Sequence, residues 1–183
     1  MAEPTAILIA IGANLPGPGG RTPLASCRAA AAALGKLPGL RLVALSRWWR
    51  SAPVPPSDQP DYVNGVARLD GWMAPEALLA ALQALERAAG RRRETDAGES
   101  AAARYAARPL DLDIIAMGNL VREAEDPLLP HPRAHQRGFV LAPLAEAAPG
   151  WVHPVLGRTV EALLAELPEQ RLDPIAVADG CCR

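Results

Sequence analysis

Short aliphatic runs along the chain alternate with amphipathic stretches. Residues 5–11 are rich in β-branched and aliphatic side chains and end at Gly12, which predicts a buried strand followed by a turn. Two-residue alternation over 40–46 predicts a second strand, which we extend into Trp48 and Trp49. Further strands are predicted over 62–69 and 110–115.

Helical patterns fill most of the gaps between these strands. Residues 23–34 place apolar side chains on one face, and Gly35 follows as a stop. Pro75 suits the first turn of a second helix, which ends at Gly90. Shorter helices are predicted over 139–147 and 159–167. Strands mixed irregularly with helices predict an α+β fold with helices packed on a largely antiparallel sheet.

Two segments lack either period and are predicted to be loops. Residues 51–60 are rich in Pro, Ser and Asp, and residues 91–109 are basic and rich in Ala, Gly and Ser. Long loops without regular structure in a compact domain are often functional. We expect one catalytic domain over 1–167 and a loosely structured tail over 168–183.

Composition and charge exclude several classes of protein. The formal net charge of −1 excludes a large non-specific nucleic-acid surface, which needs a strong positive excess. The longest apolar run, 6–11, is far too short to cross a bilayer, and the first residues lack a signal-peptide pattern. The 3 cysteines show neither a disulfide framework nor zinc-binding spacing. We expect a cytoplasmic monomer that binds neither nucleic acid nor membrane.

The sharpest local feature is an acidic pair inside an apolar strand, Asp111 and Asp113. Alternate side chains on a strand point to the same face, so both carboxylates point one way while Leu112 and Ile114 point the other. Such a pair is unfavourable unless cations or donors neutralise it, and a site for two divalent ions would do so. The alternative is a solvated strand end whose acids are satisfied by turn amides or by arginine.

A group of arginines precedes the acidic pair. Guanidinium groups suit phosphate oxygens because they donate in parallel and stay charged. On a mobile loop they could close over a nucleotide and exclude water, although a charge run is more commonly a solvated surface. Cations beside an acidic pair have the composition that a nucleoside-triphosphate site needs. The arginines are Arg91, Arg92, Arg93, Arg104 and Arg108.

Candidate partners for a planar ring come from two other segments. Tyr62 and Asn64 share one face of a predicted strand, and Phe139 is the single Phe of the chain. An aromatic side chain offers a stacking surface, and an Asn amide offers both a donor and an acceptor. For Phe139 alone, packing in the core is the commoner role. For His131, a surface or capping role is commoner than a role as a ligand. No phosphate-binding loop of the GxxxxGK[ST] type is present.

Five segments in this order resemble the 6-hydroxymethyl-7,8-dihydropterin pyrophosphokinase family of folate biosynthesis, over about 7–167. The pairing of Asp-Gln-Pro-Asp-Tyr with a later Arg-x-Leu-Asp-Leu-Asp is the most specific part of the resemblance. The segments are Ile-Gly-Ala-Asn-Leu (11–15), Asp-Gln-Pro-Asp-Tyr-Val-Asn (58–64), Gln-Ala-Leu-Glu (83–86) with Gly-Arg-Arg-Arg (90–93), Arg-Pro-Leu-Asp-Leu-Asp-Ile (108–114), and Pro-His (130–131) with Arg-Gly-Phe (137–139).

The resemblance implies a ferredoxin-like α+β fold and an enzyme that binds ATP with two Mg²⁺ ions. The hydroxyl of 6-hydroxymethyl-7,8-dihydropterin would attack the β-phosphorus of ATP, and AMP would leave. By matching position, the metal ligands would be Asp111 and Asp113, and the catalytic arginines would be Arg91 and Arg108. The residues that contact ATP would be Gln83, Arg93, Ile114, His131 and Arg137, with Glu86 nearby. The pterin would contact Pro53, Val54, Tyr62, Asn64 and Phe139.

Three departures from the family pattern leave alternatives open. Tyr105 stands where the family usually has Trp, and it could still stack on a flat ring with less area. The loop is longer around 95–103, and Pro132 replaces an aromatic residue often found after the histidine. The alternatives are a metal-dependent phosphohydrolase and a catalytically impaired or altered-specificity relative that binds pterin or nucleotide. A hydrolase would not require Tyr62, Asn64 and Phe139.

Overall fold

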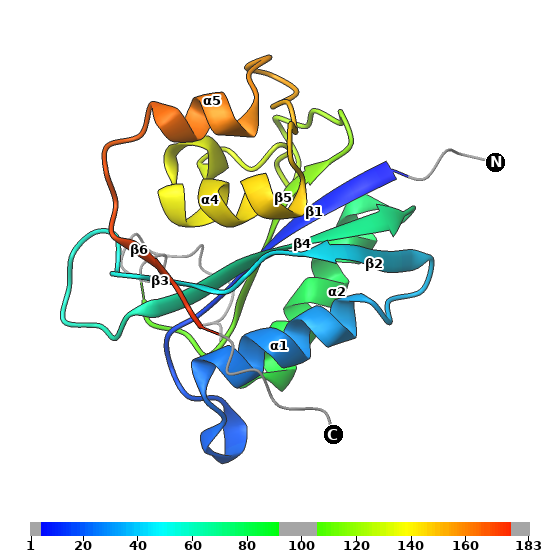
Figure 1. The fold of residues 1–183 in the computed structure, drawn as a ribbon. Helices are drawn as coiled ribbons and strands as arrows, with labels where there is room; N and C mark the ends of the chain where they lie inside the picture. Colours follow the sequence, from blue (N-terminus) through cyan, green and yellow to red (C-terminus); the bar gives the residue numbers. More distant parts are fainter. Residues whose placement is uncertain (1–4, 92–105, 177–183) are drawn as a thin grey trace, which may run out of the picture.

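The structure is a computed structural model, and it describes residues 5–91 and 106–176 (Figure 1). No helix within these two ranges is long and apolar enough to cross a membrane. The elements in chain order are β1 (Thr5–Ala13), η1 (Pro18–Gly20), α1 (Pro23–Leu34), β2 (Leu40–Leu45), β3 (Trp49–Ser51), β4 (Tyr62–Gly71), α2 (Pro75–Ala88), β5 (Asp111–Met117), η2 (Ala134–Gln136), α4 (Gly138–Ala147), α5 (Val160–Ala165) and β6 (Leu172–Pro174).

The strands form one antiparallel sheet in the order β5-β1-β4-β3-β6, and β2 also pairs with β4. The succession β1-α1-β2-β4-α2-β5 is therefore a β-α-β-β-α-β unit whose two outermost strands in sequence, β1 and β5, lie side by side. This is the ferredoxin-like arrangement. The prediction of an α+β, ferredoxin-like fold with a largely antiparallel sheet is confirmed.

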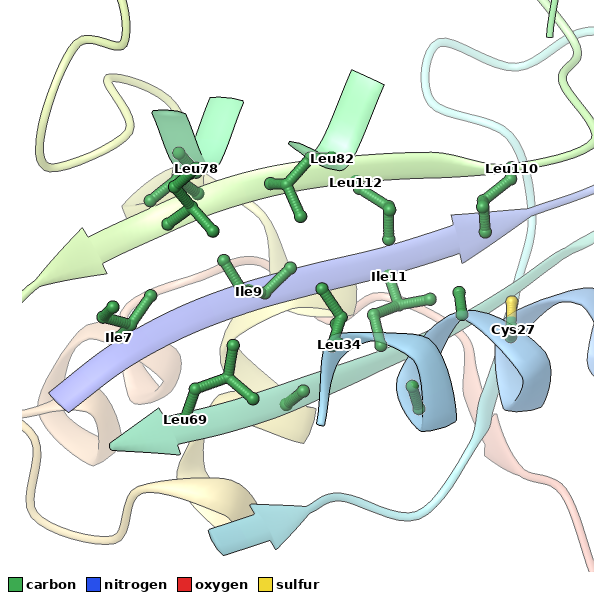
Figure 2. Close-up of a cluster of buried hydrophobic side chains, with 14 of the residues drawn as sticks. Ile7, Ile9, Ile11, Cys27, Leu34, Leu69, Leu78, Leu82, Leu110 and Leu112 are labelled. Carbon is green, nitrogen blue, oxygen red and sulfur yellow. The ribbon is translucent and has the colours of Figure 1, made fainter. Parts of the chain in front are cut away.

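Helices cover both faces of the sheet (Figure 1). On one face α1 and α2 enclose a core to which β1 contributes Ile7, Ile9 and Ile11, all fully buried (Figure 2). On the other face α4 and α5 pack over a second core that contains Leu8 and Val66. Burying one such aliphatic side chain contributes about 1.5–3 kcal/mol, so the alternation along β1 fixes which residues face which layer.

Local sequence signals set the helix bounds. The side chain of Thr22 accepts a hydrogen bond from the Ala25 N–H, and Pro23 occupies the first turn, so α1 begins as predicted. Thr159 caps α5 in the same way through the Ala162 N–H. That helix is nevertheless shorter than the predicted 159–167, since it ends at Ala165.

Two segments differ from the sequence-based expectation. The strand predicted from 40 into Trp49 breaks after β2, because the Ser46 hydroxyl accepts the Val66 N–H at 2.9 Å and donates to the Arg47 carbonyl. The chain then resumes as the separate strand β3. Residues 172–174, assigned by pattern to a loose tail, form β6 and pair with β3. The last part of that tail, 177–183, lies outside the described residues.

Candidate functional site

The candidate site lies on the α4 face of the sheet, where β1, β4 and β5 meet. Gly12 pairs with Asn64 of β4 on one side and with Asp111 of β5 on the other. Neighbouring strands are about 4.8 Å apart, so Asn64 and Asp111 are separated by about 10 Å across a residue without a side chain. A Cβ atom at Gly12 would lie 3.5 Å from Asn64 Oδ1 and 4.0 Å from Asp111 Cβ. The glycine therefore leaves open the floor between the two side chains.

The acidic pair has the predicted orientation. Leu112 and Ile114 are buried in the core under α1 and α2, whereas Asp111 and Asp113 line cavities on the opposite face. One oxygen of Asp111, Oδ1, accepts hydrogen bonds from Arg91 Nη1 at 2.6 Å and from Arg108 Nη1 at 2.9 Å. The alternative interpretation, in which arginines satisfy the acidic side chains, therefore holds in part for Asp111.

The two carboxyl groups have pKa values shifted in opposite directions. Burial raises the pKa of Asp111, but the guanidinium groups of Arg108 and Arg91 outweigh it and hold the pKa below its usual value. Burial and the neighbouring charge of Asp111 raise the pKa of Asp113 to about 7, although Arg137 opposes the rise. The site therefore holds one firmly ionised carboxylate beside a second that is only partly ionised near neutral pH.

Glu86 anchors one of the arginines from below. It is 1 % exposed, and its Oε1 accepts hydrogen bonds from Arg91 Nη1 at 2.5 Å and from the Leu112 N–H at 2.9 Å. The sequence placed Glu86 near the nucleotide by resemblance only. The signal that could have assigned it is its spacing, because it follows Leu82 by one helical turn on the buried face of α2.

The candidate ring-binding residues line one cavity of about 90 Å³. Charged residues at and around the acidic pair line the same cavity. Asn64 Nδ2 donates to Ser51 Oγ at 2.9 Å, which orients the amide. Phe139 is half-buried, packs on the core under α4 and also lines the cavity, so it packs in the core as expected for Phe139 alone, while its ring-binding role stays a prediction. The functional candidates that line the cavity are Pro53, Val54, Tyr62, Asn64, Arg108, Asp111, Arg137 and Phe139.

The residues assigned to ATP by resemblance are more scattered. Arg137 lies with its Cζ atom 5.6 Å from the centre of the Phe139 ring and lines the same cavity. The side chain of Ile114 is buried in the core, so this residue can offer a nucleotide only its main chain. Gln83 is on α2, one turn before Glu86. Arg93 and Tyr105, like Arg92 and Arg104, lie outside the described residues.

His131 is neutral and faces the acidic pair. Burial, with Arg137 and Arg133, lowers the pKa of His131 to about 4. Its Nδ1 accepts the Arg133 N–H at 3.1 Å, so the ring proton is on Nε2, which lies 3.8 Å from Asp113 Oδ2. His131 also lines a second, more apolar cavity of about 350 Å³ beside Leu128 and Val155.

A magnesium site fits the acidic pair. Within 5–91 and 106–176 no three His, Cys, Asp or Glu side chains are grouped so that they could hold a metal ion by themselves. Mg²⁺, however, is usually held by one or two carboxylates together with water and substrate phosphates. After burial, the charge of Asp111 is the next cause of the raised pKa of Asp113, so a bound cation would relieve the repulsion between the two carboxylates.

Comparison with known sequences gives matches over most of the chain. The family model described as 7,8-dihydro-6-hydroxymethylpterin-pyrophosphokinase matches residues 8–149. A relative from Pseudomonas aeruginosa is 40 % identical over 167 residues, which cover 91 % of this chain and 94 % of the relative. One from Haemophilus influenzae is 40 % identical over 146 residues, covering 80 % and 83 %. Both are named 2-amino-4-hydroxy-6-hydroxymethyldihydropteridine pyrophosphokinase.

Comparison with solved structures supports the fold. The wild-type HPPK-DHPS of Plasmodium falciparum aligns with a TM-score of 0.62 at 10 % identity, over 91 % of this chain and 42 % of that chain. This chain therefore spans less than half of the longer protein, and at this identity the likeness concerns the fold alone. The family model and the two bacterial relatives, by contrast, match this chain in sequence over most of its length. The chain belongs to the 7,8-dihydro-6-hydroxymethylpterin-pyrophosphokinase family.

Proposed function

We propose that this protein transfers the pyrophosphoryl group of ATP to the hydroxyl of 6-hydroxymethyl-7,8-dihydropterin and releases AMP, a step of folate synthesis. Family membership and the names of the bacterial relatives support this reaction. We also propose that the enzyme acts as a monomer. We assign it to the cytoplasm, where ATP is available.

One observation carries the proposal: a single cavity joins ring-binding side chains to phosphate-binding ones. Tyr62 and Phe139 supply aromatic surface, and Asn64 supplies an amide in the same cavity. Arg108 and Asp111 line the same cavity, so the hydroxymethyl group of a pterin bound there lies next to the charged residues. A phosphohydrolase that uses water as nucleophile has no need of the aromatic half.

The charged half suits a transfer between phosphates. Asp111 and Asp113 would hold two Mg²⁺ ions, which neutralise phosphate charge when they are bound. Arg91 and Arg108 present guanidinium groups suited to phosphate oxygens, and both are fixed through Asp111 Oδ1. Phosphoryl-type transfer depends mainly on positioning and charge neutralisation, so the proposal assigns no side chain as general base.

The remaining assignments concern the two substrates. Pro53 and Val54 give the pterin main-chain contacts from the loop before β4. Gln83, Arg93, His131, Arg137 and the main chain of Ile114 contact ATP, and Tyr105 stacks on a flat ring. The neutral His131 suits this role because its Nε2–H can donate to a phosphate oxygen.

The test is the formation of AMP from ATP and Mg²⁺, with and without 6-hydroxymethyl-7,8-dihydropterin. The proposal expects AMP only when the pterin is present, in amounts equal to the pterin consumed. ADP or free phosphate would instead indicate a kinase or a phosphohydrolase. Pterin binding without any product would indicate a binding protein, and either result would overturn the proposal.

A further inference from the structure

Asn14 is a buried amide at the junction of the two halves of the site. It follows β1 directly, two residues beyond Gly12, and it is 2 % exposed. The resemblance to the family assigned no role to Asn14. Its side chain and its main chain together make hydrogen bonds to segments 45 and 94 residues away along the chain.

On one side Asn14 fixes the main chain of Arg108. The amide oxygen Oδ1 accepts the Arg108 N–H at 2.8 Å, while the N–H groups of Asn14 and Leu15 donate to the Arg108 carbonyl at 3.0 and 3.2 Å. Both polar main-chain groups of Arg108 are thus held from Asn14 and its neighbour. The guanidinium of Arg108 contacts Asp111, so the hydrogen bonds of Asn14 and Leu15 fix the main-chain position from which this side chain extends.

On the other side Asn14 fixes the loop that precedes the ring-binding strand. The amide nitrogen Nδ2 donates to Gln59 Oε1 and to the Pro60 carbonyl, both at 3.2 Å. Gln59 Oε1 is in turn 3.4 Å from the hydroxyl of Tyr62, a wall of the ring cavity. A continuous chain of hydrogen bonds therefore runs from Arg108 through Asn14 and Gln59 to Tyr62.

We propose that Asn14 is a positioning residue that couples the pterin-binding wall to the arginine beside the acidic pair. Only an amide can do both, because it offers an acceptor and two donors on one short side chain. The proposal rests on the proposed function, because that function assigns the roles of Arg108 and Tyr62 at the two ends of the hydrogen-bond chain. Asn14 itself is not among the residues that line the ring cavity or the cavity beside the acidic pair.

The experiment compares Asn14→Asp, Asn14→Ala and Gln59→Ala with the unaltered protein and with Asn119→Ala, a control on the exposed turn after β5. Asp keeps the acceptor for the Arg108 N–H but loses both donors, whereas Ala loses all three groups. The readouts are the Kd for the pterin by calorimetry without nucleotide, kcat for AMP formation at saturating substrates, and the unfolding temperature.

The proposal expects a split between the two readouts. Asn14→Asp and Gln59→Ala each weaken pterin binding about tenfold, the equivalent of 1.4 kcal/mol, and leave kcat within about threefold. Asn14→Ala weakens binding similarly and also lowers kcat by at least about tenfold. The double variant Asn14→Asp with Gln59→Ala weakens binding less than the product of the single effects, because the two changes break one chain of bonds.

Two results would overturn the coupling. The first is an active protein in which the Asn14 variants have the pterin Kd and the kcat of Asn119→Ala. The second is a lower unfolding temperature with Kd and kcat unchanged in the folded fraction, which is what a purely structural residue would give. If the unaltered protein forms no AMP, the proposed function fails, and that result is distinct from both of these.

Discussion

Under α1 and α2 the sheet is covered by aliphatic side chains along its whole length, whereas under α4 the same strands change from aliphatic to polar. β1 sends Ile7, Ile9 and Ile11 to the first face, and all three are fully buried. To the second face it sends Leu8, Ala10 and Gly12, so side-chain size falls toward the site. The first face provides stability, and the second provides stability at one end and chemistry at the other.

The neighbouring strands make the same change at the same level of the sheet. β4 passes from Val66 to Asn64 as β1 passes from Ala10 to Gly12, and β5 begins at the site with Asp111 and Asp113. Pairing of three strands in register therefore gathers one glycine, one amide and two carboxylates. Changes on the two faces should consequently affect different properties.

The largest expected effect is on turnover, from Asp113→Ala. Removing this carboxylate removes half of the proposed metal site without touching either core, so AMP formation should fall by at least about a thousandfold. The unfolding temperature should stay close to that of the unaltered protein. Asp173→Ala, at a half-exposed carboxylate in β6, serves as the control and should keep full activity. Near-normal AMP formation by Asp113→Ala would contradict the metal assignment.

On the opposite face, Ile9→Ala should lower the free energy of unfolding by about 2–5 kcal/mol, because it leaves a cavity in the core under α1 and α2. Denaturant unfolding measures this loss. The protein that remains folded at 25 °C should bind the pterin and form AMP normally. A changed Kd for the pterin would mean that the two faces are not independent.

Filling the floor of the site should have a smaller and purely functional effect. In Gly12→Leu the added side chain extends from the position between Asn64 and Asp111, so pterin affinity should fall at least about tenfold. Gly12→Ala adds only a Cβ at ordinary contact distance and should lose less. Calorimetry measures the pterin affinity of the unaltered protein and of the two variants. Equal affinities for all three would contradict the proposal that the pterin ring lies over Gly12.

The smallest effect expected is a pH-dependent gain in stability from Asp113→Asn. The pKa of Asp113 is about 7 in the folded protein and near 3.8 in the unfolded chain, so the fold loses stability through this group as the pH rises from about 3.8 to about 7, and the loss is complete above that. Its side chain is 41 % exposed, and solvent therefore screens much of the cost.

The variant should unfold about 2–4 °C higher at pH 8, which corresponds to about 1 kcal/mol, and at nearly the same temperature at pH 4. Thermal unfolding at the two pH values measures this difference without magnesium. Equal shifts at both would show that neither burial nor the charge of Asp111 raises the pKa of Asp113.

Patterns within one segment were enough to predict most of this arrangement. Alternation fixed the faces of β1 and the common direction of Asp111 and Asp113, and capping residues fixed the start of α1. The break at Ser46 and the pairing of β6 were not predictable, because both depend on strands distant in the sequence. The same applies to Glu86 and Asn14, whose hydrogen bonds reach partners 26 and 94 residues away.

The most direct test of the proposed reaction follows both transferable phosphorus atoms. With ATP labelled at its β- and γ-phosphorus, the protein and 6-hydroxymethyl-7,8-dihydropterin should give a pterin product that carries both labels and AMP that carries none. Label remaining in ADP would show that only the terminal phosphoryl group moves. Label appearing in free phosphate would show hydrolysis, and either result would contradict pyrophosphoryl transfer.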